Sequence, residues 1–491
     1  MSITIGNKIR HGAKWVFIGN TGSQLINFAL GLILARLLMP AEFGMVATIL
    51  IFTNLAGFVS GGGMGQAIVR AKEAGKREYD LLFTMQSIVG LAIVGFFFAI
   101  APWFGRWYDN PLYTDLLRVA ALSFLIRPYF NVPSNILHRD MRFKAKTAVQ
   151  LSNLVVYNSV ALSLAWLGYG PWSLILAGLA SSVAGALQYA WYARWLPGIS
   201  FDFARARELM RYGLLASGNN IVVYVRGQIP TFILSRTLGP ASVGLFNKSE
   251  SLAKMPHSFI TGSVYPALFR ALAGEQDNLD KSRYLFFRSI SLVAVYATPF
   301  YIGLLWLAEP FVRGVYGPNW VEAAGPLSIL VLAWPFWLMG NLSGNVLAAR
   351  NWLDRELFVQ ISTVIVTALA IVIGLPYGIE GVAWAVVCSV AFIALYQYGL
   401  AVKCLKAKPS GYPLALVPAA VLNTLLAAVL FATDYMLPQS LRSNDYTYLA
   451  LMGLAGGAIY VAGFLYLPFS TLKAEQQRWK SMLRLSAAPV A

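Results

Sequence analysis

The sequence predicts an all-α integral membrane protein of about 14 transmembrane helices, built as two pseudo-symmetric six-helix bundles followed by two more helices. Three observations support this prediction. Of the 491 residues, 58% are hydrophobic and only 12% are charged, about half the charged fraction of ordinary soluble domains. Many apolar stretches reach the roughly 20 residues that a helix needs to cross a bilayer. The two halves of the chain also repeat one pattern.

The repeat is clearest at a proline-containing motif. Leu-Ile-Leu-Ala-Arg-Leu-Leu-Met-Pro-Ala-Glu-Phe-Gly at 32–44 aligns without a gap with Phe-Ile-Leu-Ser-Arg-Thr-Leu-Gly-Pro-Ala-Ser-Val-Gly at 232–244. Each copy ends one apolar segment, turns at the proline and begins the next. The Gly-Tyr-Gly turn at 168–170 has a counterpart in Pro-Tyr-Gly at 376–378. A chain of two similar membrane halves usually has its working site between them.

The expected spans follow from splitting the apolar runs at proline, glycine and charged clusters. The first six lie near 15–38, 43–69, 81–103, 113–137, 146–167 and 172–194. The next six lie near 213–236, 242–269, 285–308, 322–348, 356–376 and 381–402, and the last two near 413–433 and 447–468. The first span is too long for the apolar core of a signal peptide, so we interpret it as a transmembrane helix.

These spans divide the chain into five predicted regions. They are an N-terminal six-helix bundle at 1–195, an amphipathic cytoplasmic linker at 196–212, a C-terminal six-helix bundle at 213–405, two additional helices at 406–470 and a cytoplasmic tail at 471–491. The linker mixes basic and apolar residues, which is typical of a segment that lies on the membrane surface.

The distribution of basic residues predicts the orientation. Most of the 38 lysines and arginines lie on one side of the predicted membrane, together with both termini. The opposite side carries only Arg36, Arg106, Arg236, Arg313 and Arg442. This bias predicts that both termini are cytoplasmic. It also accounts for the net charge of +17, so we expect no nucleic-acid partner.

Some basic residues lie deep inside the predicted spans: Arg127, Arg226, Lys248 and Lys254. A charge at such depth costs about 2.5–3.5 kcal/mol unless it faces a partner or a water-filled cavity. Arg118 and Arg288 lie nearer span ends, where they can reach the interface. Among the acidic residues only Glu250 is equally deep. The predicted interior is therefore cationic and favours an anionic cargo.

Polar residues form a stripe on the eighth predicted span. They recur at steps of three and four residues: Asn247, Glu250, Ser251, Lys254, His257, Ser258 and Thr261. Asn27 and Asn220 belong to milder stripes on the first and seventh spans. Two interpretations remain open, because such a stripe either bonds neighbouring helices or lines a wet path. Glu250 and Lys254 have the spacing of an ion pair, and Glu250 and His257 are the candidate coupling residues.

Motifs for catalysis and metal binding are missing from the sequence. It contains no phosphate-binding loop of the P-loop type. Its three histidines, His11, His138 and His257, lack metal-ligand spacing. The glycines at 61–63 and Gly65 indicate close helix packing rather than a dinucleotide site. We therefore expect a transporter with no cofactor and no metal, not an enzyme.

The motif at 34–44, its second copy at 234–244 and the Gly-Tyr-Gly-Pro-Trp-Ser turn at 168–173 resemble the polysaccharide transporter branch, Wzx- or WzxC-like, of the multidrug/oligosaccharidyl-lipid/polysaccharide flippase superfamily. The resemblance covers roughly residues 8–470. It implies two six-helix bundles around a central V-shaped cavity, alternating access and a lipid-linked oligosaccharide as cargo. It also implies cationic residues in that cavity.

The function that we expect is a flippase for an undecaprenyl-pyrophosphate-linked repeat unit of a cell-surface polysaccharide, in the bacterial inner membrane. The expected cavity residues are Arg127, Arg226, Lys248, Lys254, Asn27 and Asn220. The expected partners are the bilayer and the polysaccharide polymerase with its chain-length machinery. The alternatives are a drug or metabolite antiporter, a lipid II-type flippase, and a membrane-embedded glycosyltransferase or polymerase, which the short loops disfavour.

Overall fold

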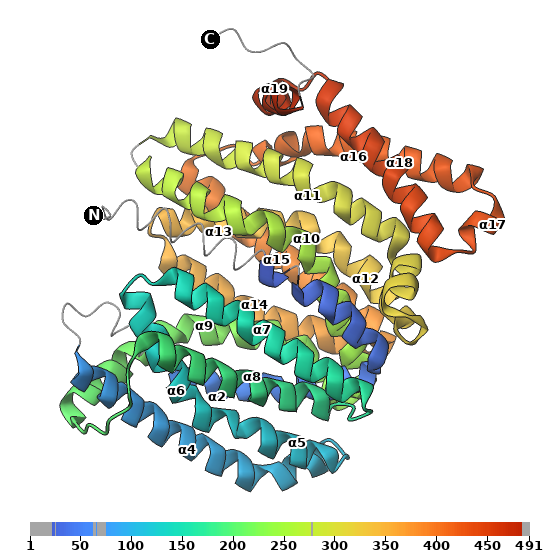
Figure 1. Ribbon diagram of the computed structural model, residues 1–491. Helices are drawn as coiled ribbons and strands as arrows, with labels where there is room; N and C mark the ends of the chain where they lie inside the picture. The colour runs from blue at the N-terminus through green and yellow to red at the C-terminus, as the bar shows by residue number, and fades with distance from the viewer. Residues whose placement is uncertain (1–21, 25, 62–64, 66–74, 276–277, 484–491) are drawn as a thin grey trace. The chain divides into compact units, whose positions relative to one another are not determined.

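A computed structural model describes residues 22–24, 26–61, 65, 75–275 and 278–483 (Figure 1). Nearly all of these residues are helical, and none of them lies in a β-strand. The prediction of an all-α protein is therefore confirmed.

The chain divides into two compact units, Met1–Gly244 and Leu245–Ala491. The first contains the helix Gly22–Leu37, α2 (Pro40–Gly61), α4 (Lys76–Trp107), α5 (Leu112–Ala121), α6 (Ser123–Arg139), α7 (Phe143–Trp166), α8 (Trp172–Ala193), α9 (Phe203–Thr237) and the start of α10 (Gly239–Gly274). The predicted linker at 196–212 is helical from Phe203 onward, within α9. The five predicted regions stay predictions.

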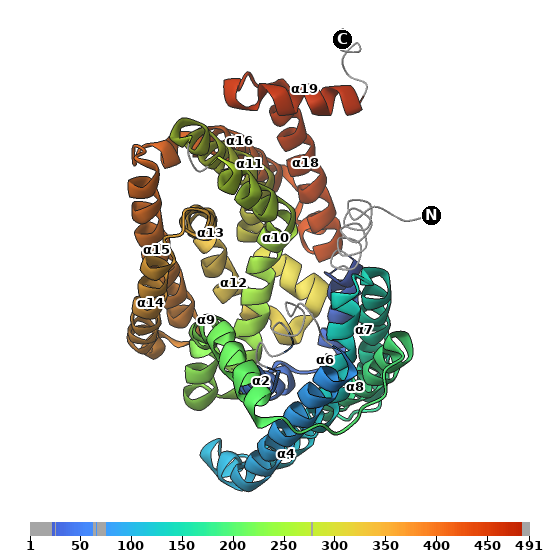
Figure 2. The ribbon, with the colours of Figure 1, turned by 90° about the vertical axis from the view of Figure 1, so that its left-hand side faces the viewer.

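The second unit holds the rest of α10 and the helices that follow it. These are α11 (Leu279–Tyr316), η1 (Pro318–Ala323), α12 (Ala324–Leu330), η2 (Val331–Ala333), α13 (Trp334–Ala349), α14 (Leu353–Gly374), η3 (Leu375–Tyr377), α15 (Gly378–Leu405), α16 (Gly411–Met436), α17 (Gln439–Arg442), α18 (Asp445–Tyr466), η4 (Ser470–Leu472) and α19 (Lys473–Met482). In Figure 2, α14 and α15 run side by side.

The described helices match the predicted spans in order. By length and composition, nine helical stretches within the described residues can cross a membrane. The helices α9 and α10, which carry polar stripes, are not among them. The chain is thus a multi-pass membrane protein, while the count of fourteen spans stays a prediction.

The fourth predicted span of each half is broken, which the sequence pattern did not predict. In the first unit α5 and α6 meet at Leu122, and in the second a 3₁₀ turn at 331–333 separates α12 from α13. Proline lacks the N–H that would bond four residues back. Pro335 therefore lies at the start of α13. Apolar residues continue across both breaks, so periodicity alone does not reveal them.

The two copies of the repeated motif pack directly against each other within the first unit. A Cβ atom on Gly44 would overlap the carbonyl oxygen of Pro240, and one on Gly244 would overlap that of Pro40. Each proline lies at the start of its helix, where its missing N–H has no helical partner to lose. The two copies of the motif therefore form the two sides of one close backbone contact.

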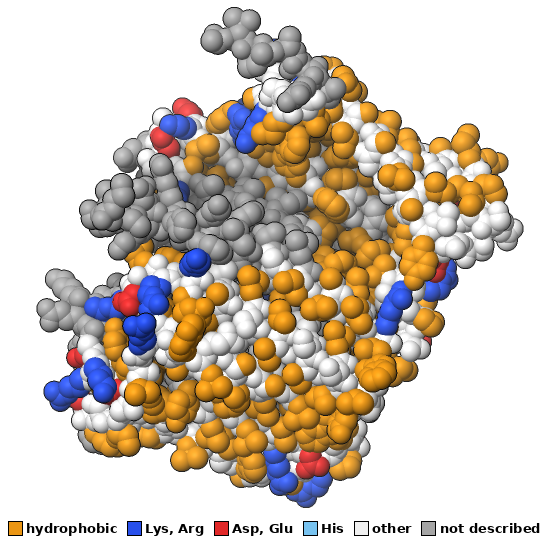
Figure 3. Space-filling view, in the orientation of Figure 1, with side chains coloured by type: hydrophobic (Ala, Val, Ile, Leu, Met, Phe, Trp, Pro, Cys, Tyr) orange, Lys and Arg blue, Asp and Glu red, His pale blue; other side chains and the backbone are white. Residues whose placement is uncertain are grey.

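Large apolar side chains cover much of the outer surface. Examples in the first unit are Leu187 and Trp191 of α8, and in the second Ile365, Leu369 and Ile373 of α14, each 59–74% exposed. In Figure 3 hydrophobic side chains cover broad areas, while lysines, arginines and acidic residues gather in small groups at the margins. A soluble protein rarely exposes so much apolar surface, whereas helices in a bilayer do so.

Candidate functional site

A polar seam runs between α2 and α6 inside the first unit. Three residues of α6 lie one turn apart and each packs on a glycine of the facing segment: Arg127 on Gly57, Asn131 on Gly61 and Asn135 on Gly65. A Cβ atom at Gly57 would overlap the Arg127 guanidinium. The prediction of close helix packing is therefore confirmed at Gly61 and Gly65, while the glycines at 62 and 63 lie outside the described residues. The glycines leave room for long polar side chains where larger residues would exclude them.

The surroundings of the seam are partly aromatic and partly polar. The Arg127 guanidinium lies over the Phe124 ring, 4.6 Å from its centroid, in the arrangement of a cation–π contact. The Asn131 Nδ2 atom lies 3.5 Å from Oε1 of Gln86, a buried residue of α4. A guanidinium with nearby amide donors can bind anionic oxygens and hydroxyl groups. The polar seam, defined as Arg127, Asn131 and Asn135, therefore has the chemistry of an anion or sugar site.

The helix α9 also packs on α2. The Tyr224 hydroxyl donates to the backbone oxygens of Leu50 and Ile51, at 3.2 Å each. Its ring lies 5.4 Å from that of Phe58. Arg226, two residues further along α9, is half-buried, whereas Asn220 and Asn27 are exposed. Arg127 and Arg226 thus belong to two helices that both contact α2.

Lys248 of α10 lies beside two aromatic rings in the second unit. Its Nζ atom is 4.7 Å from the ring centroid of Tyr316 and 5.4 Å from that of Trp320. The neighbouring Ser249 hydroxyl donates to the Ala323 carbonyl oxygen at 2.7 Å, which ties α10 to η1. The ammonium group therefore has two ring faces to stabilise its charge where water is scarce.

Glu250 and Lys254 form the predicted ion pair, with Nζ 2.6 Å from Oε1. The Glu250 side chain is 18% exposed and that of Lys254 is 50% exposed. The two residues lie one helical turn apart and their side chains are partly exposed. Exposed ion pairs of this kind are weak, so an anionic ligand can compete with Glu250 for Lys254.

One turn further along α10, His257 contacts α13. The Nδ2 atom of Asn341 lies 3.3 Å from His257 Nε2 and donates to the Trp337 backbone oxygen at 2.9 Å. The His257 and Trp337 rings have centroids 6.5 Å apart. The Asn345 amide donates to the Asn341 backbone oxygen at 2.9 Å. We call His257, Trp337, Asn341 and Asn345 the α10–α13 cluster.

The eight residues predicted from the sequence divide between the units. Four belong to the first unit: Arg127, Arg226, Asn27 and Asn220. The other four belong to the second unit: Lys248, Glu250, Lys254 and His257. Their roles in binding and coupling stay predictions.

Sequence reasoning missed the amides that accompany these residues. The sequence pattern does not single out Asn131 and Asn135 of the polar seam or Asn341 of the α10–α13 cluster, nor the Trp337 ring beside His257. A signal for the seam was present, since the glycines at 57, 61 and 65 and the polar residues at 127, 131 and 135 share one four-residue step. Matching polar and small-residue stripes between spans would have found it.

Long apolar helices carry the cations and amides described above. This combination is typical of a multi-pass membrane transporter. The fold of the chain is similar to that of a solved structure, the lipid II flippase MurJ in an inward closed conformation. The TM-score is 0.74 at 15% identity, over 95% of this chain and 99% of that one. At this identity the likeness shows the fold alone.

The chain belongs to the family described as "Polysaccharide biosynthesis protein", whose sequence model matches residues 33–325. It is 24% identical to the lipopolysaccharide biosynthesis protein WzxC of Escherichia coli (strain K12) over 378 residues, 76% of each chain. It is 23% identical to the teichuronic acid biosynthesis protein TuaB of Bacillus subtilis (strain 168), over 98% of this chain and 99% of that one. The resemblance inferred from the repeated motif is confirmed.

Proposed function

We propose that the protein is a flippase that moves an undecaprenyl-pyrophosphate-linked oligosaccharide from the cytoplasmic to the periplasmic leaflet by alternating access. The observation that carries the proposal is the polar seam, a guanidinium and two amides inside an apolar bundle of a polysaccharide biosynthesis protein. Relatives named for lipopolysaccharide and teichuronic acid synthesis support a glycan cargo.

The proposed cargo has an anionic part and a neutral sugar part. Cationic side chains suit the first, and amide and aromatic side chains suit the second. The pyrophosphate and any acidic sugars are anionic, so they bind the cations Arg127, Arg226, Lys248 and Lys254. The neutral sugars present hydroxyl groups and apolar ring faces. Amides and aromatic rings suit these groups, so Asn27, Asn220, the seam amides and the α10–α13 cluster are the proposed glycan contacts.

Ion coupling is assigned to Glu250 and His257. A phosphate on Lys254 would compete with the Glu250 carboxylate, which lies 2.6 Å away in the structure. Opening of this pair would expose a carboxylate to protons or cations at the moment of binding. His257 lies on the same face, one turn beyond Lys254, and is the second proposed coupling residue.

The setting of the protein is also part of the proposal. We assign it to the inner membrane of a bacterium with both termini in the cytoplasm, because the basic residues are concentrated on one side. There it would receive its cargo from the enzymes that assemble the repeat unit. It would deliver the cargo to a polysaccharide polymerase and its chain-length machinery.

Deletion of the gene in its host tests the proposed function. We expect surface polymer to disappear and a lipid-linked oligosaccharide of complete repeat-unit mass to accumulate in the membrane, measured by mass spectrometry of extracted lipids. A normal polymer level would contradict the proposal. Drug sensitivity of the deletion strain, or rescue of a strain that lacks lipid II flipping, would assign the protein to one of the other classes.

Replacing Asn341 by alanine is expected to lower polymer output about fivefold, because one glycan hydrogen bond of about 1 kcal/mol is lost. Polymer is measured per amount of protein in the membrane. Thr424→Ala on α16 is the matched control, since Thr424, like Asn341, donates to the carbonyl four residues back. Equal output from both variants would remove Asn341 from the glycan contacts.

A further inference from the structure

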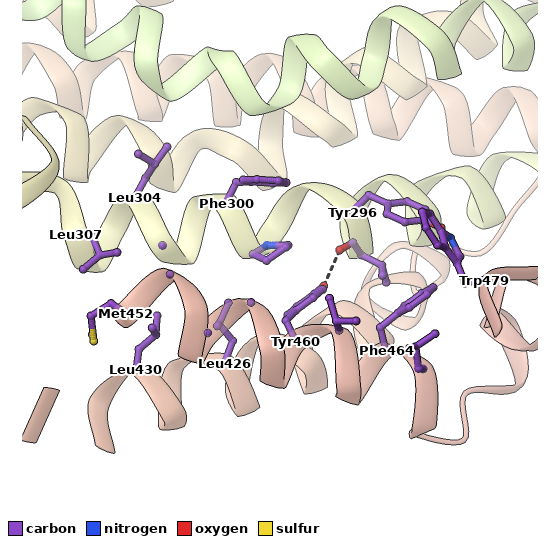
Figure 4. Close-up of a pocket in the computed structure, with 18 of the residues that line it drawn as sticks. Tyr296, Phe300, Leu304, Leu307, Leu426, Leu430, Met452, Tyr460, Phe464 and Trp479 are labelled. Carbon is purple, nitrogen blue, oxygen red and sulfur yellow. Dashed lines mark hydrogen bonds between the residues drawn. The ribbon is translucent and has the colours of Figure 1, made fainter. Parts of the chain in front are cut away.

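An apolar groove lies on the second unit, apart from the polar residues described above. Its volume is about 720 Å³, within the roughly 300–1,000 Å³ of sites that hold one ligand. In Figure 4, Leu307 of α11 points toward Met452 of α18 and Leu430 of α16. Phe300 and Leu304 of α11 also line the groove. Almost all of its lining is apolar, so its occupant has to be apolar as well.

Glycines explain why there is a groove at this place. Gly303 of α11 and Gly453 and Gly457 of α18 line it, and a Cβ atom added at any of them would meet no atom within 4 Å. Gly456 behaves differently, because its Cβ would press on Leu426 and Leu430. One glycine thus packs α18 on α16, while the others leave open space on the groove side.

Hydrogen-bonded aromatic residues close one end of the groove. The Trp479 Nε1 atom donates to the Tyr296 hydroxyl at 2.8 Å, which ties α19 to α11. The Tyr460 hydroxyl donates to the Val295 backbone oxygen at 2.6 Å, which ties α18 to α11 (Figure 4). Tryptophan and tyrosine with polar tips are enriched at the level of lipid headgroups. This end of the groove therefore lies at a membrane interface.

The helix α19 gives this end a positive charge. It lies across the end of α18 (Figure 2) and carries Lys473, Arg478 and Lys480 against the single acid Glu475. Lys480 is held over the ring of Tyr466, with Nζ 5.1 Å from the centroid. Each basic residue near an anionic lipid surface contributes about 1 kcal/mol to the attraction.

We propose that the groove binds one acyl chain of an anionic glycerophospholipid, whose phosphate lies on Arg478 and Lys480 of α19. The apolar lining takes the chain, and the basic helix at its mouth selects the charge of the headgroup. This lipid would be a resident component that fixes α19 to α11 and α18. It is distinct from the transported cargo, which we assign to the polar residues.

The test uses the purified full-length protein, exchanged with vesicles of equal parts phosphatidylglycerol and phosphatidylethanolamine. Native mass spectrometry counts the lipids that remain bound. We expect phosphatidylglycerol to be retained in preference to phosphatidylethanolamine. Gly453→Leu and Gly457→Leu should each reduce this retention about tenfold, because the new side chain fills the space of several methylene groups.

A control and a second pair of variants keep the test decisive. Gly399 of α15 also has open space at its Cβ and does not line the groove. Gly399→Leu should therefore leave retention unchanged. Arg478→Gln with Lys480→Gln should leave the total lipid count unchanged but abolish the preference for phosphatidylglycerol.

Three results would overturn the proposal. Equal retention of both phospholipids by the unaltered protein would show a non-selective lipid coat. Retention that survives filling of the groove would place the lipid elsewhere. Displacement of the bound phospholipid by undecaprenyl phosphate, with no effect of the charge variants, would assign the groove to a polyprenyl chain. None of these readouts depends on transport, so failure of the proposed flippase activity is a separate outcome.

Discussion

Polymer export is expected to fall to background when Arg226 is replaced by alanine, while the amount of protein in the membrane stays unchanged. Loss of a charge-assisted contact to phosphate costs about 1.5–3 kcal/mol, which is about a ten- to hundredfold loss of affinity. Arg226→Lys should retain part of the output, because an ammonium keeps the charge but not the bidentate geometry. The measurements are surface polymer and immunoblotted membrane protein.

Arg288→Ala is the control for this variant. Arg288 is also half-buried in a long helix, but its guanidinium contacts Tyr284 one turn earlier on the same helix, and its predicted position is near a span end. We expect normal export from Arg288→Ala. Normal export from Arg226→Ala would exclude Arg226 from the binding residues, and a loss in both variants would point to a general effect of removing membrane arginines.

The second large effect is expected at the close contact between the repeated motifs. Gly44→Ala and Gly244→Ala each add a methyl group where a backbone carbonyl oxygen already lies. Backbone cannot move aside as a flexible side chain can, so we expect a cost of at least about 3 kcal/mol, at the upper end for overpacking. The expected result is little protein in the membrane and a lowered unfolding temperature in detergent, measured by scanning fluorimetry.

Gly227→Ala tests whether this effect belongs to the contact. A Cβ atom on Gly227 of α9 would meet no atom within 4 Å. Alanine should therefore be neutral or stabilise the helix by up to about 1 kcal/mol. An unfolding temperature of Gly44→Ala equal to that of Gly227→Ala would mean that the motifs do not pack as closely as described.

Much of the fold could be predicted because each membrane-spanning helix is a run of about 20 apolar residues, which is easily recognised in a sequence. The repeated motif at 32–44 and 232–244 predicted two related halves, and in the structure Gly44 of the first copy packs on Pro240 of the second. The Glu250–Lys254 ion pair followed from helical spacing alone. Such features depend on residues that are close in sequence, or on identity between copies, and both can be read from one chain.

Features that depend on which helix faces which could not be predicted in the same way. The partner of Arg127 is Gly57 on another helix, and the partner of His257 is Asn341 on α13. Periodicity shows that a helix has a polar face but does not identify the neighbour of that face. The breaks at Leu122 and at 331–333 were missed for a related reason, because apolar residues continue through them.

We propose that this protein carries a lipid-linked anionic glycan across a bilayer and binds it with its internal cations. This transport is tested most directly by reconstituting the purified protein into vesicles that contain the lipid-linked oligosaccharide extracted from the deletion strain. A membrane-impermeant oxidant of sugars then reports the fraction in the outer leaflet. We predict that vesicles with the protein expose the inner-leaflet pool over time, and that vesicles with Arg226→Ala do not. Equal exposure with and without the protein would contradict the claim.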